Sequence, residues 1–352
     1  MQVLSLWVSK NFCRRELQRL ATMTTVKTPH DLLAAVPFLI GYHPSNSLVL
    51  ISVKADALEM AMRIDFPINP PDGAYALLAS HLKRDHADGA LLVAYEPEGI
   101  EAGPEVLRNA ADAVAALEIP IRELMLVRNG RWRSLLCSDE NCCPADGNPI
   151  EDFQNSRITA EQVANGKVLP FSDSDGLTHS ISPTLFAKDI NWNAQVIGFR
   201  VDPDAANLNE LQRDGAESVL LLADIYMQQG FCKDYDLIAR VLGRLTDVQV
   251  RDFALGCHTE ESLNAYWAMW RDLLRIAPPK FVAPVASLFA AIAYENGEGA
   301  LAHRALDRAI DDEPEYSLSR LLRRVFSSGW PPSGFAQLRA ELHPRVTKTI
   351  FG

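Results

Sequence analysis

Three cysteines close together in the sequence are the residues best suited to thiol or metal chemistry. Cys137, Cys142 and Cys143 fall within seven residues of a turn-rich segment. Thiolates at this spacing could bind zinc, but a closed structural zinc site needs four ligands and usually shows two separated CxxC pairs. His179 is the nearest downstream candidate for a fourth ligand. Adjacent cysteines are also awkwardly placed to point at one metal, so we predict no cofactor and keep zinc as an alternative.

The same cysteines have two other interpretations. A redox pair between Cys137 and either Cys142 or Cys143 requires the two Cα atoms to lie within about 7 Å. Otherwise the three thiols stay reduced and fill the base of a loop. Six cysteines in a chain of 352 residues do not make a disulfide scaffold. The other three are scattered along the chain, as Cys13, Cys232 and Cys257.

A second candidate site is the polar segment His-Pro-Ser-Asn-Ser at residues 43–47. A histidine next to serines suggests a general base and a nucleophile, as in a hydrolase or transferase. However, no strand–serine–helix elbow and no oxyanion-hole motif accompanies them, and short polar side chains are ordinary turn chemistry. We assign no catalytic residue. The candidate ligand-binding residues are His43, Ser45, Asn46 and Ser47, together with Arg251.

The residues around this segment predict a helix, a tight turn and a buried strand. Thr-Pro at 28–29 is typical of a helix start. Pro37 lacks an amide hydrogen, so the helix is predicted to end or kink near Val36. Gly41 can adopt the positive φ that closes a helix, and the apolar run 48–53 predicts a buried strand. Loops at the ends of such strands are where ligands tend to bind.

The first half of the chain alternates between predicted strands and helices. Asn129–Gly130 is a strong two-residue hairpin signal. The order predicts an α/β N-terminal domain, a mixed sheet with flanking helices. No glycine-rich phosphate motif follows a strand, so nucleotide binding is not predicted. The predicted strands are 48–53, 58–66, 89–95, 121–127 and 132–137, and the predicted helices 73–87 and 104–117.

The second half predicts an all-helical domain. We divide the chain into an N-terminal extension (1–23, upstream of a start at Met23), an α/β domain (24–152), a polar connector (153–203) and a helical domain (204–352). The predicted helices are 160–164, 205–229, 236–245, 247–254, 260–276, 282–295, 299–311 and 316–327.

One helix pair in this domain shows a repeat-like pattern. Ala302, Leu306, Ala309 and Pro314 match the spacing in the second half of a tetratricopeptide repeat (TPR). The first half of the pattern is not matched, and no second copy lies about 34 residues away in either direction. The sequence therefore predicts one TPR-like helical hairpin within the domain.

Charge and hydropathy exclude some partners. The net charge is −11 and the pI about 5.2, whereas binding to nucleic acid or an anionic membrane needs clustered positive charge. No apolar run reaches the roughly 18–20 residues that span a bilayer. The basic residues near the N-terminus follow its apolar stretch, unlike those of a signal peptide. We expect a cytoplasmic protein with no nucleic-acid partner and no membrane contact.

Three segments resemble one family. They are LLAAVPFLIGYHPSNSLVLISV (32–53), WRSLLCSDENCCPADGNPI (132–150) and GEGALAHRALDRAIDDEPEYSLSRLLRRVFSSGWPP (297–332). All three are similar to the domain-of-unknown-function 4192 family of actinobacterial proteins. The resemblance implies a soluble bacterial protein and supplies no activity.

These observations favour a non-catalytic binding or scaffold protein. Its ligand or partner, an unidentified protein or small molecule, would meet the cleft between domains or the loop at 43–47. The alternatives are an enzyme that uses His43 and Ser45, and a thiol or metal module at Cys137–Cys143.

Overall fold

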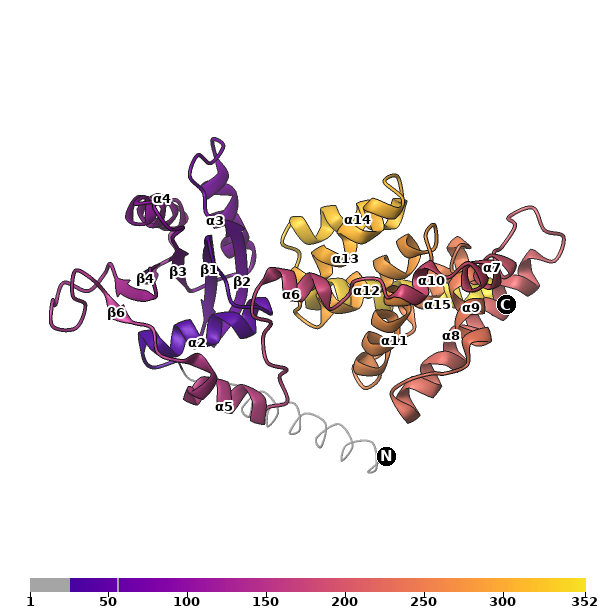
Figure 1. Ribbon diagram of the computed structural model, residues 1–352. Helices are drawn as coiled ribbons and strands as arrows, with labels where there is room; N and C mark the ends of the chain where they lie inside the picture. The colour runs from indigo at the N-terminus through magenta and orange to yellow at the C-terminus, as the bar shows by residue number, and fades with distance from the viewer. Residues whose placement is uncertain (1–25, 56) are drawn as a thin grey trace, which may run out of the picture. The chain divides into compact units, whose positions relative to one another are not determined.

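A computed structural model describes residues 26–55 and 57–352 (Figure 1). The chain divides into two units, Met1–Ser174 and Asp175–Gly352, and each is described by itself. The predicted N-terminal extension, residues 1–23, lies outside the described residues.

The strands of the first unit form one mixed sheet, as predicted. Its order is β2–β1–β3–β4–β5–β6. Strand β1 pairs antiparallel with both β2 and β3, β3 pairs parallel with β4, and β5 pairs antiparallel with β4 and β6. The strands are β1 (Ser47–Lys54), β2 (Ala57–Asp65), β3 (Gly89–Tyr95), β4 (Ile121–Arg128), β5 (Arg131–Ser134) and β6 (Asn148–Pro149).

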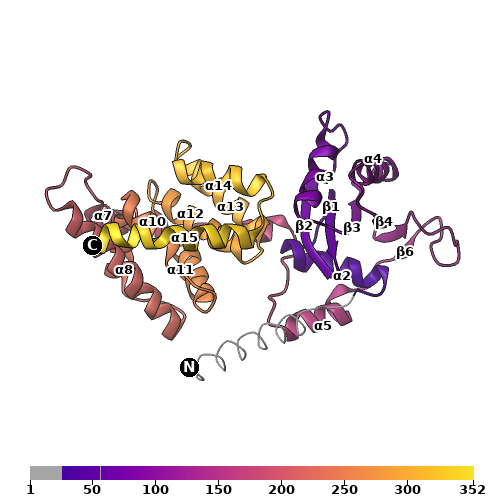
Figure 2. The ribbon, with the colours of Figure 1, turned by 180° about the vertical axis from the view of Figure 1, so that it is seen from behind.

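Helices cover both faces of this sheet. Successive strand side chains point to opposite faces, and Leu48 and Leu50 of β1 point to the face that packs against α3 (Ala74–Arg84) and α4 (Gly103–Ala115). On the other face lie α2 (Pro29–Ile40), which packs against β2, and α5 (Arg157–Ala164), which packs against α2. A short 3₁₀ helix, η1 (Phe153–Asn155), precedes α5, and Figure 2 shows α2 and α5 side by side.

Helix α2 confirms most of the local prediction and corrects one part of it. The Oγ1 of Thr28 accepts a hydrogen bond from the Asp31 N–H, and Gly41 ends the helix with φ of 90° and an N–H donated to the Pro37 carbonyl. The predicted end near Val36 is wrong, because the helix continues to Ile40. Pro37 removes one backbone hydrogen bond in the last turn, while burial of Ile40 holds the segment helical.

The hairpin between β4 and β5 forms as predicted. Asn129 and Gly130 have φ of 50° and 70°, the left-handed values that a type I′ turn requires at both central residues. The strand after the turn is shorter than predicted, because β5 ends at Ser134 and residues 135–147 form a loop that leads to β6. The cysteines lie in this loop.

The second unit is helical, and α12 lies at its core. Every residue from Val282 to Tyr294 is buried, and the carboxylate of Asp312 accepts hydrogen bonds from the first N–H groups of α12. The TPR-like assignment of α12 and α13 stays a prediction. The helices are α6 (Ser174–His179, which begins on the last residue of the first unit), the 3₁₀ helix η2 (Leu185–Lys188), α7 (Ile190–Gly198), α8 (Leu208–Gln229), α9 (Tyr235–Arg244), α10 (Val248–Gly256), α11 (Leu263–Ile276), α12 (Val282–Glu295), α13 (Gly299–Asp312), α14 (Ser317–Ser327) and α15 (Pro332–Phe351).

Two features of the second half differ from the prediction. The segment predicted as a connector, 153–203, is divided between the units and contains helices from η1 to α7. Packing stabilises these short helices: Trp192 is buried and its Nε1–H donates to the Ile276 carbonyl at 2.8 Å. Helix α15 lies beyond the predicted helices. None of the helices described is long and apolar enough to cross a membrane.

Candidate metal centre

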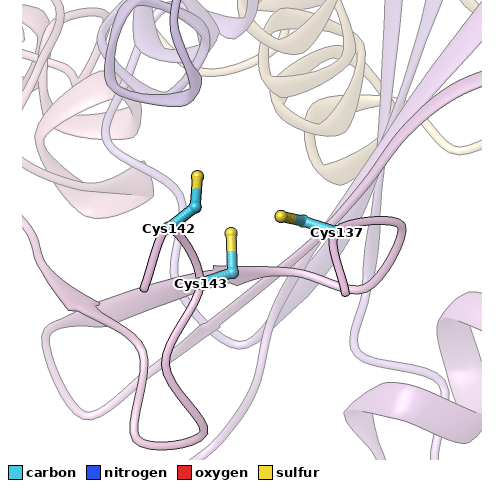
Figure 3. Close-up of side chains that lie close together, drawn as sticks. All are labelled: Cys137, Cys142 and Cys143. Atoms are coloured by element: carbon cyan, nitrogen blue, oxygen red, sulfur yellow. The ribbon is translucent and has the colours of Figure 1, made fainter. Parts of the chain in front are cut away.

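The thiols of Cys137, Cys142 and Cys143 converge in the loop between β5 and β6 (Figure 3). Their Sγ atoms all lie within 4.8 Å of one another. Cys137 approaches from the β5 side of the loop, while Cys142 and Cys143 extend their sulfurs in parallel from the returning arm. The two adjacent cysteines thus bring their sulfurs close to that of Cys137, and whether the three can point at one metal stays a prediction.

A compact turn folds the returning arm back onto Cys137. The carbonyl of Asp139 accepts hydrogen bonds from the N–H groups of Cys142 at 3.1 Å and Cys143 at 2.8 Å. The Nδ2 of Asn148, on β6, donates to the Cys142 carbonyl at 2.9 Å. The positions of the sulfurs thus depend on backbone contacts within the loop and on its anchoring to the sheet edge.

Two arginines of β5 bind the far side of the loop. The Nη2 of Arg131 donates to the Gly147 carbonyl at 2.7 Å, and the Nη1 of Arg133 donates to the Ala145 carbonyl at 3.4 Å. Gly147 has φ of 75°, and a Cβ there would lie 2.8 Å from the Trp132 carbonyl oxygen. Glycine therefore permits the close approach of loop and strand, and the arginines bring positive charge to the same sheet edge as the thiols.

The three thiols differ in exposure. Cys143 is buried, Cys137 is half-buried and Cys142 is exposed. The pKa of Cys143 is raised to about 11, mainly by burial and also by the neighbouring thiols, while a hydrogen bond with the Ser134 backbone acts in the opposite direction. Cys143 is thus protonated at neutral pH, and a metal ion must displace its proton to bind.

The spacing of the sulfurs suits thiolate coordination. Two sulfurs bound at about 2.3 Å to a tetrahedral zinc ion lie about 3.8 Å apart. The three Sγ atoms of the loop lie within 4.8 Å of one another, which is compatible with this spacing. Among the described residues no histidine or carboxylate joins the group. His179, the fourth ligand considered from the sequence, is in α6 of the second unit and is not part of it. The three thiols are thus the soft ligands that this loop could offer to a metal ion.

The loop at 43–47 is pinned to other parts of the first unit. The His43 ring stacks on Phe153 with centroids 6.2 Å apart, and the backbone N–H of His43 donates to the Phe171 carbonyl at 3.0 Å. Burial lowers the pKa of His43. Among the described residues no hydrogen bond joins His43 to Ser45 or Ser47, so the structure pairs this histidine with an aromatic ring instead.

The other residues of this loop point to different surroundings. Ser45 and Asn46 are exposed, and Asn46 has φ of 45°. Ser47 is the first residue of β1 and is fully buried, and its Oγ has no hydrogen-bond partner in the part of the chain that the structure describes. The structure does not gather these four residues around one point. Their role in ligand binding stays a prediction.

Ligands often bind at the carboxyl ends of parallel strands in α/β folds. At the carboxyl ends of β3 and β4, this position is taken by the side chain of Glu96. Glu96 directly follows β3 and is buried, and its Oε1 accepts a hydrogen bond from the N–H of Gly103, the first residue of α4, at 2.5 Å. Its other oxygen pairs with Arg128 at the end of β4. This carboxylate occupies the place at a helix N-terminus where an anionic ligand would bind.

Arg251, the last predicted site residue, lies in α10 of the second unit. It is buried and forms an ion pair with Asp252 at 2.6 Å. The cysteines and Arg251 stay predicted site residues, whereas Arg131, Arg133 and Asn148, which contact the cysteine loop, were not predicted from the sequence. These residues belong to the two strands that flank the cysteine loop, and the hairpin pattern was the signal that could have drawn attention to them.

Fold and site together define a two-unit protein with a mixed α/β unit, a helical unit and a tricysteine loop in the first. The chain belongs to the family described as "Domain of unknown function (DUF4192)", whose sequence profile matches residues 29–333. The resemblance of the three sequence segments is thereby confirmed. No curated protein and no solved structure matches the chain.

Proposed function

We propose that this protein is a non-catalytic binding protein whose α/β unit holds a thiophilic metal ion, Zn²⁺ or Cu⁺, at Cys137, Cys142 and Cys143. One observation carries the proposal: three sulfurs from one loop lie within 4.8 Å of one another. Soft thiolate ligands select zinc and monovalent copper over hard cations such as magnesium. The family match supplies no competing activity.

Charge at the sheet edge supports the same proposal. Three thiolates around Zn²⁺ leave a net charge of about −1, and around Cu⁺ about −2. The guanidinium groups of Arg131 and Arg133 bind the returning arm of the loop and would offset part of this charge. Reduced cysteines are required for binding, so the expected cytoplasmic location belongs to the proposal.

The test is metal binding by the reduced full-length protein. We expect one equivalent of Zn²⁺ or Cu⁺ to bind, measured by competition with a chromophoric chelator under anaerobic conditions. Co²⁺ in place of Zn²⁺ should give sulfur-to-cobalt charge-transfer absorption. Cys137→Ser, Cys142→Ser and Cys143→Ser should each weaken binding by about tenfold or more. Cys232→Ser, a half-buried thiol of the second unit, is the matched control and should bind like the parent protein.

Three results would overturn the proposal. The first is that the protein takes up neither metal. The second is that the three serine variants take up metal as the parent protein does. The third is a stable disulfide between Cys137 and Cys142 or Cys143 that forms as readily in the presence of metal as in its absence. The last result would support the redox interpretation. The enzyme interpretation at His43 has no supporting contact and stays a prediction.

A further inference from the structure

The second unit contains a groove between α10, α14 and α15 that plays no part in the proposed metal site. Its volume is about 300 Å³, at the lower end of the range for small-molecule sites. Its lining combines aliphatic side chains with charged and polar ones. The lining includes Arg251, Asp252, Leu318, Leu321, Leu342 and Val346.

The aliphatic part of the groove is incompletely covered. Leu318 of α14 is buried, whereas Leu321 of α14 and Leu342 of α15 are 49% and 46% exposed. Two leucines from different helices thus present apolar surface to water across one groove. An aliphatic chain lying between them would remove this surface from water, which is favourable in proportion to the apolar area buried.

The charged part of the groove has hydrogen-bonding capacity left over. Arg251 is only 7% exposed. Its Nε and Nη2 both donate to the same oxygen, Oδ1 of Asp252, at 2.8 and 2.6 Å, and its Nη1 donates to the Tyr316 hydroxyl at 3.3 Å. A guanidinium group has five N–H donors. Two donors of a buried cation therefore lack an acceptor among the described residues.

A second arginine in the lining has four of its five N–H donors engaged by acceptors of the protein itself. Arg339 of α15 donates to both carboxylate oxygens of Glu295, at 2.6 and 3.1 Å, and its Nη1 donates to the carbonyls of Gly256 and His258. These bonds fix α15 to the ends of α10 and α12. Arg251, with two donors left against one on Arg339, is thus the lining arginine with more hydrogen-bonding capacity for a ligand.

We propose that this groove binds an unbranched aliphatic carboxylate, with its carboxylate on Arg251 and its chain between Leu321 and Leu342. Arginine binds carboxylates through paired N–H donors, and the leucine and valine side chains of the lining offer an aliphatic chain apolar contact. Asp252 shares Arg251 with the ligand, so it acts as an internal competitor. Removing the charge of Asp252 should strengthen binding, whereas removing Arg251 should abolish it.

The full-length protein is titrated with sodium octanoate, and binding is measured by calorimetry and by saturation-transfer NMR. We expect saturable binding of one octanoate, and weaker binding of 1-octanol, which has the same chain without the charge. Arg251→Gln and Leu342→Glu should each reduce octanoate affinity by about tenfold or more. Asp252→Asn should raise it severalfold. Leu221→Glu, an equally exposed leucine on α8, is the control and should leave it unchanged.

The design separates folding from binding. Circular dichroism shows whether Arg251→Gln still folds. If it does not, the Leu342 and Asp252 variants still test the groove, because both side chains are partly exposed. The proposal is overturned if octanoate does not saturate, if octanol binds as tightly as octanoate, or if Asp252→Asn weakens binding. None of these outcomes bears on the cysteine site, which lies in the other unit.

Discussion

Arg339 and Glu295 form a buried, bidentate ion pair. The guanidinium donates from Nε to Oε1 at 2.6 Å and from Nη2 to Oε2 at 3.1 Å. The side chains are 8% and 4% exposed. His258, also buried, contacts the same carboxylate at 2.9 Å. The pair joins the final helix, α15, to the core helix α12.

Breaking this pair should destabilise the helical unit strongly. Arg339→Met leaves the Glu295 carboxylate buried with fewer donors, and we expect a loss of about 3 kcal/mol in the free energy of unfolding. Urea denaturation measures it. Arg320→Met, which removes an exposed ion pair with Glu315, should cost less than about 1 kcal/mol. Equal losses in the two variants would contradict this assignment.

The same carboxylate should give the unit an acid-sensitive stability. Burial by itself raises the pKa of Glu295, but hydrogen bonds from His258 and Arg339 outweigh burial and hold this pKa below its ordinary value of 4.5. The stabilisation is therefore complete above about pH 4.5 and is lost as the pH falls from there through the folded-state pKa. Glu295→Gln should flatten this part of a stability–pH curve. A curve of unchanged slope in the variant would refute the prediction.

Metal affinity at the cysteine loop should increase with pH. The pKa of Cys143 is raised to about 11, so metal binding at neutral pH releases a proton from this thiol. Affinity should rise by about tenfold per pH unit for each proton released. Chelator competition at a series of pH values measures the slope. A pH-independent affinity would show that Cys143 does not ligate.

The close approach at the start of α4 should make Gly103 intolerant of a side chain. A Cβ at this position would lie 2.4 Å from Leu126 Cδ1 and 2.9 Å from the Glu96 Oε1. Gly103→Ala should therefore destabilise the α/β unit by about 1–3 kcal/mol. Gly299→Ala, at the start of α13 with open space around it, should be neutral or slightly stabilising. Thermal denaturation of both variants checks the contrast.

Local signals were sufficient for much of the α/β unit. The Asn129–Gly130 turn, the buried run of β1 and the cap at Gly41 each depend on residues within a few positions of one another. Pro37 is the exception. Its missing donor predicted a helix end or kink near Val36, but the helix continues to Ile40, which is buried.

The sequence by itself determined the types and order of most of the elements and the residues capable of thiol chemistry, but not the helices α6, α7 and α15. It did so because turn geometry, capping and side-chain alternation act over a few residues. Only the tertiary structure decided that three thiols meet and that Arg251 lines a partly aliphatic groove. The first depends on the Asp139 carbonyl and Asn148 folding a loop onto itself. The second depends on α15, which packs onto α10 through contacts with residues more than 80 positions away.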